Sequence, residues 1–332
     1  MSKNILKQIG KYSYVIVFLL IFLVYVITSD GLTWAGVMNI FRHSAIVGII
    51  AFGMGLVCLT GEIDLSVGSM LAIDAGFSVV IFNMTGSVVL TLLFALAFGA
   101  IGGLINGILV GYVKMPAFIV TLATMLIYRS FSQYFCQRLD KALIGGGSSV
   151  YKMSRDIASY QGLYDFGNSK VATIPTVGVV LVLITIVFVY LTLCTKYGKK
   201  VYAIGSNENG AKMAGINVNL VKTSVFVING ILVGLAAFLW IAMNGSCDPA
   251  TTGNSYEMYA IAAVVLGGIS MSGGKGRVLG IFFGALSYTA IDKIIVALKM
   301  DSLINDAIKG IILIIVIMIQ IIGPQLKNKF KH

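Results

Sequence analysis

The chain has 332 residues, of which 58% are hydrophobic and only 11% charged, and its mean hydropathy is +0.95. A soluble domain carries about 25% charged residues, so this composition excludes a globular protein with a water-covered surface. The formal net charge of +11 does not indicate nucleic-acid binding, because the basic residues lie between hydrophobic stretches and not together on one soluble face. We therefore expect no nucleic-acid partner.

Apolar stretches follow one another along the whole chain, and several approach the roughly 20 residues that a helix needs to cross a bilayer. Helices are expected because a helix satisfies its own backbone hydrogen bonds inside lipid. We predict an all-α membrane protein of about ten transmembrane helices, at residues 13–29, 44–60, 66–82, 88–112, 116–136, 172–194, 222–243, 257–271, 277–298 and 303–323. The first has basic residues before it but no small-residue cleavage site after it, so it is interpreted as an uncleaved span.

The predicted spans form one domain, 1–332, with two five-helix halves at about 1–137 and 172–323. An even number of spans places both termini on one side of the membrane, and both termini are rich in lysine. Because Lys and Arg hold short loops in the cytoplasm, we expect both termini to be cytoplasmic. An odd number of spans in each half makes the expected repeat an inverted one.

Two polar segments between spans are long enough to have structure of their own. The external loop, 138–171, contains three consecutive glycines and several aromatic residues. Two interpretations stay open for it: contact with an extracytoplasmic partner, or a disordered linker. The cytoplasmic loop, 195–221, is predicted to contain a short helix with Asn207 as its N-cap and Gly215 as its C-cap.

Small residues recur at four-residue spacing on two of the predicted helices. They are Gly99, Gly103, Gly107 and Gly111 on one helix and Gly276, Gly280 and Gly284 on another. Such faces let helix backbones approach closely in a membrane. We expect them to pack within the subunit and not to form a dimer interface.

The third and eighth predicted spans are short or interrupted by glycine, and they occupy matching places in the two halves. In inverted-repeat transporters such segments mark the path of the substrate. The candidate path residues are Asp64, Ser66, Ser69, Ser270 and Ser272. The alternative interpretation is structural, because Asp and Ser are common helix caps and loop residues.

The sequence lacks the residues of an enzyme active site. Its two histidines, His43 and His332, cannot form a metal cluster, and no glycine-rich phosphate loop is followed by Lys-Ser or Lys-Thr. No catalytic residue, metal or cofactor is therefore expected in this chain. Few ionisable residues lie within spans: Asp74, Arg129, Asp292, Lys293, Asp306 and Lys309. Asp306 and Lys309 are three residues apart and are expected to pair, so we assign no proton or sodium relay.

Four strings resemble, in order and spacing, the signatures of permease subunits of ribose-, xylose- and galactoside-type ABC importers. They are Gly61–Ser69, Pro116–Met125, Gly205–Val218 and Tyr256–Gly268 with the trailing Ser272-Gly273-Gly274. The resemblance extends from about residue 40 to the C-terminus. Three departures stand out: Asn209-Gly210-Ala211 where Glu-Ala-Ala is usual, Tyr259 where Asp is common, and Ala123 where Gly is common.

The resemblance implies a ten-helix sugar permease of a bacterial inner membrane that works as a pair with a second permease copy. It also implies two ATP-binding cassette subunits, which hydrolyse ATP in the cytoplasm, and a solute-binding protein outside. The coupling loop that docks into the ATPase would comprise Gly205, Asn207, Glu208, Ala211, Gly215 and Ile216. Alternatives are a permease for a nucleoside, a sugar-derived signal or a branched-chain amino acid, or an ion-coupled secondary transporter.

Overall fold

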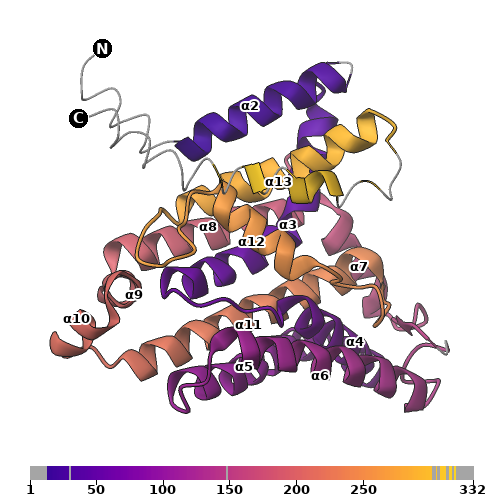
Figure 1. Cartoon of the computed structure of the whole chain (residues 1–332). Helices are drawn as coiled ribbons and strands as arrows, with labels where there is room; N and C mark the ends of the chain where they lie inside the picture. The colour runs from indigo at the N-terminus through magenta and orange to yellow at the C-terminus, as the bar shows by residue number, and fades with distance from the viewer. Residues whose placement is uncertain are drawn as a thin grey trace.

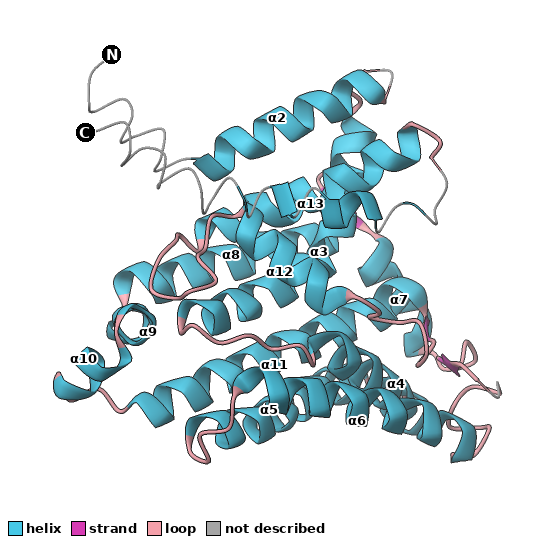
Figure 2. Cartoon of the chain, in the orientation of Figure 1, coloured by secondary structure: helices cyan, strands magenta, loops and turns pink. Residues whose placement is uncertain are grey.

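The computed structural model describes residues 13–29, 31–146, 149–300, 304, 307–311, 314, 315 and 318. Helices dominate this part of the chain, as Figures 1 and 2 show. In chain order they are α2 (Ser13–Thr28), α3 (Trp34–Leu59), α4 (Val67–Thr85), α5 (Val88–Gly111), α6 (Ala117–Arg138), α7 (Ser159–Asn168), α8 (Thr176–Cys194), α9 (Lys196–Ser206), α10 (Glu208–Met213), α11 (Val218–Asn244), α12 (Tyr256–Leu266) and α13 (Leu279–Ala297). The short strands are β1 (Tyr151–Lys152), β2 (Lys170–Val171), β3 (Ile174–Pro175) and β4 (Ser246–Cys247).

Every predicted span except the last coincides with a helix. Within the described residues, six helices are long and apolar enough to cross a membrane: α3, α4, α5, α8, α11 and α13. The helices α2 and α12 are apolar but shorter, and α6 has 22 residues with a more polar sequence. The expected last span, 303–323, falls largely outside the described residues. The chain is thus multi-pass and all-helical in its membrane part, while ten spans in an inverted repeat stay a prediction.

The centre of the bundle is formed by α3 and α11, with α8 near its outside (Figure 1). In the most apolar stretch of α3, 83% of the residues are buried, against 33% in α8. Exposed leucine, isoleucine and valine side chains cover the outer side of α8. This distribution is expected for a bundle surrounded by lipid, where apolar side chains face outward as well as inward.

The start of α3 differs from the prediction. We expected a span from residue 44, but the helix begins at Trp34 after the N-cap Thr33. The Arg42 guanidinium donates a hydrogen bond to the side chain of Asn168 at the end of α7. The contact with Asn168 therefore allows the charged Arg42 to lie within α3, which is longer than the span predicted from the sequence.

The helices α5 and α11 pack backbone to backbone along the glycine face of α5. A Cβ at Gly103 would collide with the carbonyl oxygen of Phe226, and one at Gly107 would lie 2.8 Å from the carbonyl oxygen of Thr223. The Thr223 hydroxyl donates to the carbonyl oxygen of Gly107 at 2.8 Å. The expectation that this face packs within the subunit is confirmed.

The helices α4 and α12 start close together inside the bundle. The chain is non-helical at residues 60–66 before α4 and at residues 267–278 after α12. Gly68 and Gly253 bring the starts of the two helices into backbone contact, since a Cβ on either would collide with the carbonyl oxygen of the other. Of the two spans predicted to be short, α12 has 11 residues and α4 has 19.

The described part of loop 138–171 is folded, which contradicts the disordered-linker interpretation. β1 pairs antiparallel with β4, and β2 pairs antiparallel with β3. Tyr151 is fully buried, and its hydroxyl donates to the carbonyl oxygen of Ser132 at 2.9 Å. Asn83 of α4 donates to the carbonyl oxygens of Leu143 and Lys152. These contacts fasten the loop to the end of the bundle that carries α7.

Candidate functional site

Loop 195–221 folds as two short helices at the end of the bundle opposite α7 (Figure 1). The Asn207 side chain accepts a hydrogen bond from the Gly210 backbone N–H at 2.9 Å, so the predicted N-cap is confirmed. The C-cap of α10 is Ala214, and Gly215 follows it with φ +77°. The predicted C-cap is therefore one residue too late, and Gly215 supplies the left-handed turn that ends the helix.

The helix α9 was not predicted from the sequence. It buries Gly198, Val201 and Ile204 on one side, while Lys199 and Lys200 are exposed on the other. This three-residue spacing of small and apolar residues is amphipathic, and it was the available signal for the helix.

Gly205 allows the end of α9 to pack closely against the end of α3 and the loop after α12. A Cβ at Gly205 would collide with the carbonyl oxygen of Leu59 and lie 2.5 Å from the backbone nitrogen of Gly274. The Gly274 N–H donates to the carbonyl oxygen of Leu59 at 2.9 Å, and the Tyr202 hydroxyl donates to the carbonyl oxygen of Gly276 at 2.9 Å. The end of α9 thus contacts both the end of α3 and the loop after α12.

Two further predicted coupling residues pack against the bundle, and a residue that was not predicted is exposed to solvent. Ala211 is buried and Ile216 packs against the core. Met213, which the sequence analysis did not select, is 90% exposed at the end of α10. Its flexible side chain is available for contact with a partner, because methionine adapts to irregular binding surfaces.

Glu208 lies in a cluster of four charged side chains. Lys222 at the start of α11 contacts Glu62 at 2.6 Å and Glu208 at 2.9 Å, and Lys212 contacts Glu208 at 2.7 Å. The hydrogen bonds from Lys212 and Lys222 lower the pKa of Glu208 to about 2. Because this pKa is depressed, the ion pairs of Glu208 contribute fully at neutral pH, and their contribution is lost as the pH falls through about 2.

Asp64 and Ser66 lie in a fully buried polar cluster. One oxygen of Asp64 accepts from the Ser66 backbone N–H at 2.9 Å and from its hydroxyl at 2.6 Å. The other oxygen accepts from Asn229 of α11 at 2.9 Å, and Asn106 of α5 donates to the Ser66 hydroxyl at 2.9 Å. The cluster joins the loop before α4 to α5 and α11.

The capping interpretation of Asp64 is partly correct, because it bonds the Ser66 backbone N–H, while the Ser66 side chain makes no capping bond. The sequence analysis missed Asn106 and Asn229. Their only signal was an amide side chain in an otherwise apolar span.

The remaining path candidates make local contacts. Ser69 is buried on α4, Ser270 is partly buried and Ser272 is exposed. The Ser272 N–H donates to the Ser270 hydroxyl at 3.3 Å, and the Ser270 N–H donates to the carbonyl oxygen of Lys275. For Ser270 and Ser272 these contacts favour the loop interpretation.

Four of the ionisable residues predicted within spans, Asp74, Arg129, Asp292 and Lys309, contact polar groups. The Asp74 carboxylate accepts from Ser78 at 3.2 Å, and Arg129 donates to two carbonyl oxygens, those of Pro249 and Thr252. Lys309 pairs with Asp292 at 2.9 Å, whereas Asp306 lies outside the described residues. No group of three or more His, Cys, Asp or Glu side chains suited to a metal occurs in the described part of the chain.

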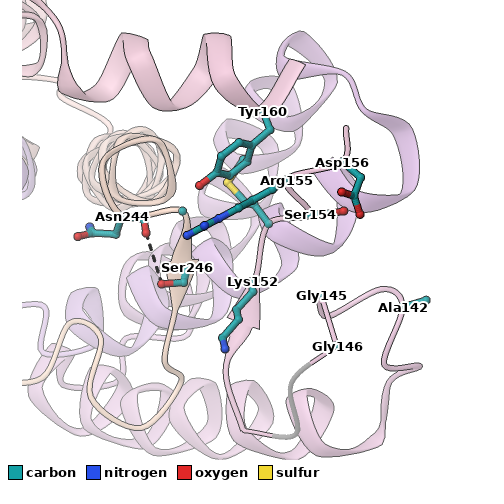
Figure 3. A pocket seen from close by; sticks show the side chains of 12 residues that line it. Ala142, Gly145, Gly146, Lys152, Ser154, Arg155, Asp156, Tyr160, Asn244 and Ser246 are labelled. Carbon is teal, nitrogen blue, oxygen red and sulfur yellow. Dashed lines mark hydrogen bonds between the residues drawn. The ribbon is translucent and has the colours of Figure 1, made fainter. Parts of the chain in front are cut away.

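A polar cavity of about 700 Å³ opens at the α7 end (Figure 3). Its lining comes from the folded external loop and from the end of α11, and comprises Ala142, Gly145, Gly146, Lys152, Met153, Ser154, Arg155, Asp156, Tyr160, Asn244, Gly245 and Ser246. Arg155 extends towards Asn244 and Ser246, while Asp156 points away from them. The exposed cations Lys152 and Arg155 make this cavity suited to an acidic group.

Comparison with known proteins identifies the family. Residues 36–317 match the family described as the branched-chain amino acid transport system permease component. The chain is 34% identical to the ribose import permease protein RbsC of Bacillus subtilis strain 168, over 91% of this chain and 89% of that protein. It is 32% identical to RbsC of Escherichia coli strain K12, over 92% of each.

A further relative is the autoinducer 2 import system permease protein LsrC of Yersinia pseudotuberculosis serotype O:3, strain YPIII. The chain is 34% identical to it, over 83% of this chain and 74% of that protein. No solved structure gives a significant match. The resemblance to permease subunits of ribose-type ABC importers is confirmed, and the chain belongs to this family of transport-system permease components, which are not enzymes.

Proposed function

We propose that this chain is the membrane subunit through which a sugar passes in an ATP-driven importer. Two copies would form the permease, ATP-binding cassette subunits would bind at the α10 end, and a solute-binding protein would deliver the sugar at the α7 end. The observation that carries the proposal is the packing of α9 against the bundle. Gly205 contacts the end of α3 and the loop after α12, and Tyr202 contacts the same loop.

The α10 end has the properties of an ATPase-binding surface. The helix α10 is short, capped at its start by Asn207 and fixed to the bundle by buried Ala211, so it moves as a rigid body. Its end presents Met213 to solvent. A rigid element with an exposed apolar side chain transmits a displacement that a flexible loop would absorb.

The substrate proposal rests on the relatives. The B. subtilis and E. coli relatives are named for ribose import, which favours a pentose or a similar small sugar. The Y. pseudotuberculosis relative is named for autoinducer 2 import, which favours a sugar-derived signal as the second candidate. The cavity with Lys152 and Arg155 would receive an acidic side chain of the binding protein.

The test is purification of the complex from the native host in mild detergent, followed by mass spectrometry. We expect an ATP-binding cassette subunit to co-purify with the unaltered chain and to be lost from Met213→Asp. The matched control is Met84→Asp, which changes a 61% exposed methionine at the α7 end of α4 and should retain the ATPase. A chain that purifies alone and drives uptake in liposomes from an ion gradient would contradict the proposal in favour of a secondary transporter.

The same purification tests the substrate. A co-purified binding protein is assayed for ribose and for autoinducer 2 by calorimetry. Tight ribose binding would support the first candidate and tight autoinducer 2 binding the second, while binding of neither sugar-like compound would contradict both.

A further inference from the structure

Lys222 joins two segments that are far apart in the sequence. Its ammonium contacts Glu62 in the loop after α3 and Glu208 at the start of α10. The Lys222 side chain is 11% exposed, and those of Glu62 and Glu208 are 21% and 36% exposed. The two carboxylates therefore approach one another only because a largely buried cation lies between them.

This arrangement differs from the neighbouring surface pair. Lys212 and Glu208 are four residues apart on one helix, with side chains 48% and 36% exposed, and such pairs contribute little. Loss of Lys222 would instead remove the cation that contacts both carboxylates, and Lys212 would remain as the counter-charge of Glu208 alone. Glu62 would then be left without this partner, so α10 and the Glu62 loop would no longer be held together.

The same helix also holds the far end of the Glu62 loop. Asn229 lies seven residues after Lys222 on α11, which places both side chains on one face of the helix. Asn229 donates to Asp64 at 2.9 Å, and Asp64 bonds Ser66, directly before α4. One face of α11 thus binds α10 and both ends of segment 62–64.

We propose that Lys222 is a positioning residue that ties α10 to the Glu62–Ser66 loop, so that a displacement of α10 is carried to the start of α4. This inference rests on the proposed function for its consequence in transport. In that setting an ATPase that moves α10 also moves the buried Asp64 cluster. Without the Lys222 contacts, α10 moves while the loop stays in place.

The first measurement needs no partner. Hydrogen exchange of the purified chain in detergent is compared among the unaltered protein, Lys222→Gln and the control Lys200→Gln, which removes an exposed charge from nearby α9. We expect Lys222→Gln to accelerate exchange in both α10 and residues 60–66, and Lys200→Gln to change neither. Faster exchange in α10 alone, or in neither segment, would overturn the inference.

The second measurement is transport with the co-purified ATPase. We expect Lys222→Gln to retain the ATPase and its hydrolysis but to lower sugar uptake per ATP by about tenfold, within the range of typical couplings between sites. Lys222→Arg should restore the ratio. An unchanged ratio of uptake to ATP hydrolysis in Lys222→Gln would contradict the inference. Failure of the unaltered chain to bind any ATPase would contradict the proposed function, but it would not affect the hydrogen-exchange result.

If Lys222→Gln does not fold, Glu62→Gln provides the second variant, because Glu62 lies outside the predicted coupling loop and its side chain is 21% exposed. It removes the Glu62–Lys222 ion pair while leaving Glu208–Lys222 intact. Uptake per ATP should fall with the ATPase still bound. A folded Glu62→Gln protein with an unchanged ratio would overturn the inference equally.

Discussion

At the scale of single residues, the site depends on positions where a side chain is absent as much as on those where one is present. Gly205 contributes no functional group, yet its missing Cβ lets α9 reach the backbones of Leu59 and Gly274. Lys222 and Asn229 act instead through their side chains, because each donates a hydrogen bond to a carboxylate from another segment. Both kinds of residue serve to hold loops in place against α9, α10 and α11.

Gly205→Ala should destabilise the folded protein by about 1–3 kcal/mol, the usual cost of forcing extra atoms into a packed contact. The added methyl group would collide with backbone and not with a movable side chain. Thermal unfolding in detergent measures the effect. The control is Gly210→Ala in α10, where a Cβ would meet only the Asn207 side chain at 3.3 Å or more. Equal melting temperatures for the two variants would contradict the close seating of α9.

At the scale of elements, the fold is held by helix pairs that approach through small residues. The helices α5 and α11 meet along the glycine face of α5, and α12 meets α13 where Gly267 and Gly280 leave no room for a Cβ on either side. In lipid, apolar burial gives no advantage to one helix contact over another, so close backbone packing decides which helices pair. The exposed apolar residues of α8 are consistent with this, because they lie on the outside of the bundle and not in a helix contact.

Gly103→Ala should therefore destabilise the α5–α11 pair more than the neighbouring Gly102→Ala. The Cβ at Gly103 would collide with the carbonyl oxygen of Phe226, whereas that at Gly102 would meet the flexible end of Met70 at 3.1 Å. We expect about 1–3 kcal/mol for Gly103→Ala and a smaller loss for Gly102→Ala. Chemical or thermal unfolding in detergent compares them, and a reversed order would show that α5 and α11 do not pack as described.

At the scale of the whole molecule, the two ends of the bundle have different characters. One end carries α9 and α10 with their lysines and the exposed Met213, and the other carries α7, the short strands and the polar cavity. The clustering of Lys196, Lys199 and Lys200 favours a cytoplasmic α10 end. The folded loop with its cavity then faces outward, where a delivered solute would arrive.

This orientation predicts opposite accessibilities for two introduced cysteines in a background without Cys58, Cys136, Cys194 and Cys247. In intact spheroplasts, Lys152→Cys should react with a membrane-impermeant maleimide, whereas Met213→Cys should react only after the membrane is permeabilised. The parent without cysteines is the control for labelling of other groups. The reverse pattern would place α10 outside and would contradict the proposed ATPase contact.

The sequence alone determined the features that depend on local physics. Apolar length located the described spans, although α3 begins ten residues earlier than predicted. The N-cap Asn207 was predicted correctly, the end of α10 within one residue, and the four-residue glycine spacing predicted close packing. Asp64 and Ser66 were predicted as path residues because they lie at a short span flanked by glycine, and their role in the path stays a prediction.

Only the tertiary structure decided what those residues contact. Lys222 lies 160 residues from Glu62, and Asn229 lies 165 residues from Asp64, so no periodicity or spacing in the sequence could pair them. The same holds for the external loop, whose order comes from β1 pairing with β4 and from Tyr151 being buried against α6. Local patterns specify helices and caps, but the partner of a buried polar group is set by how the helices pack together.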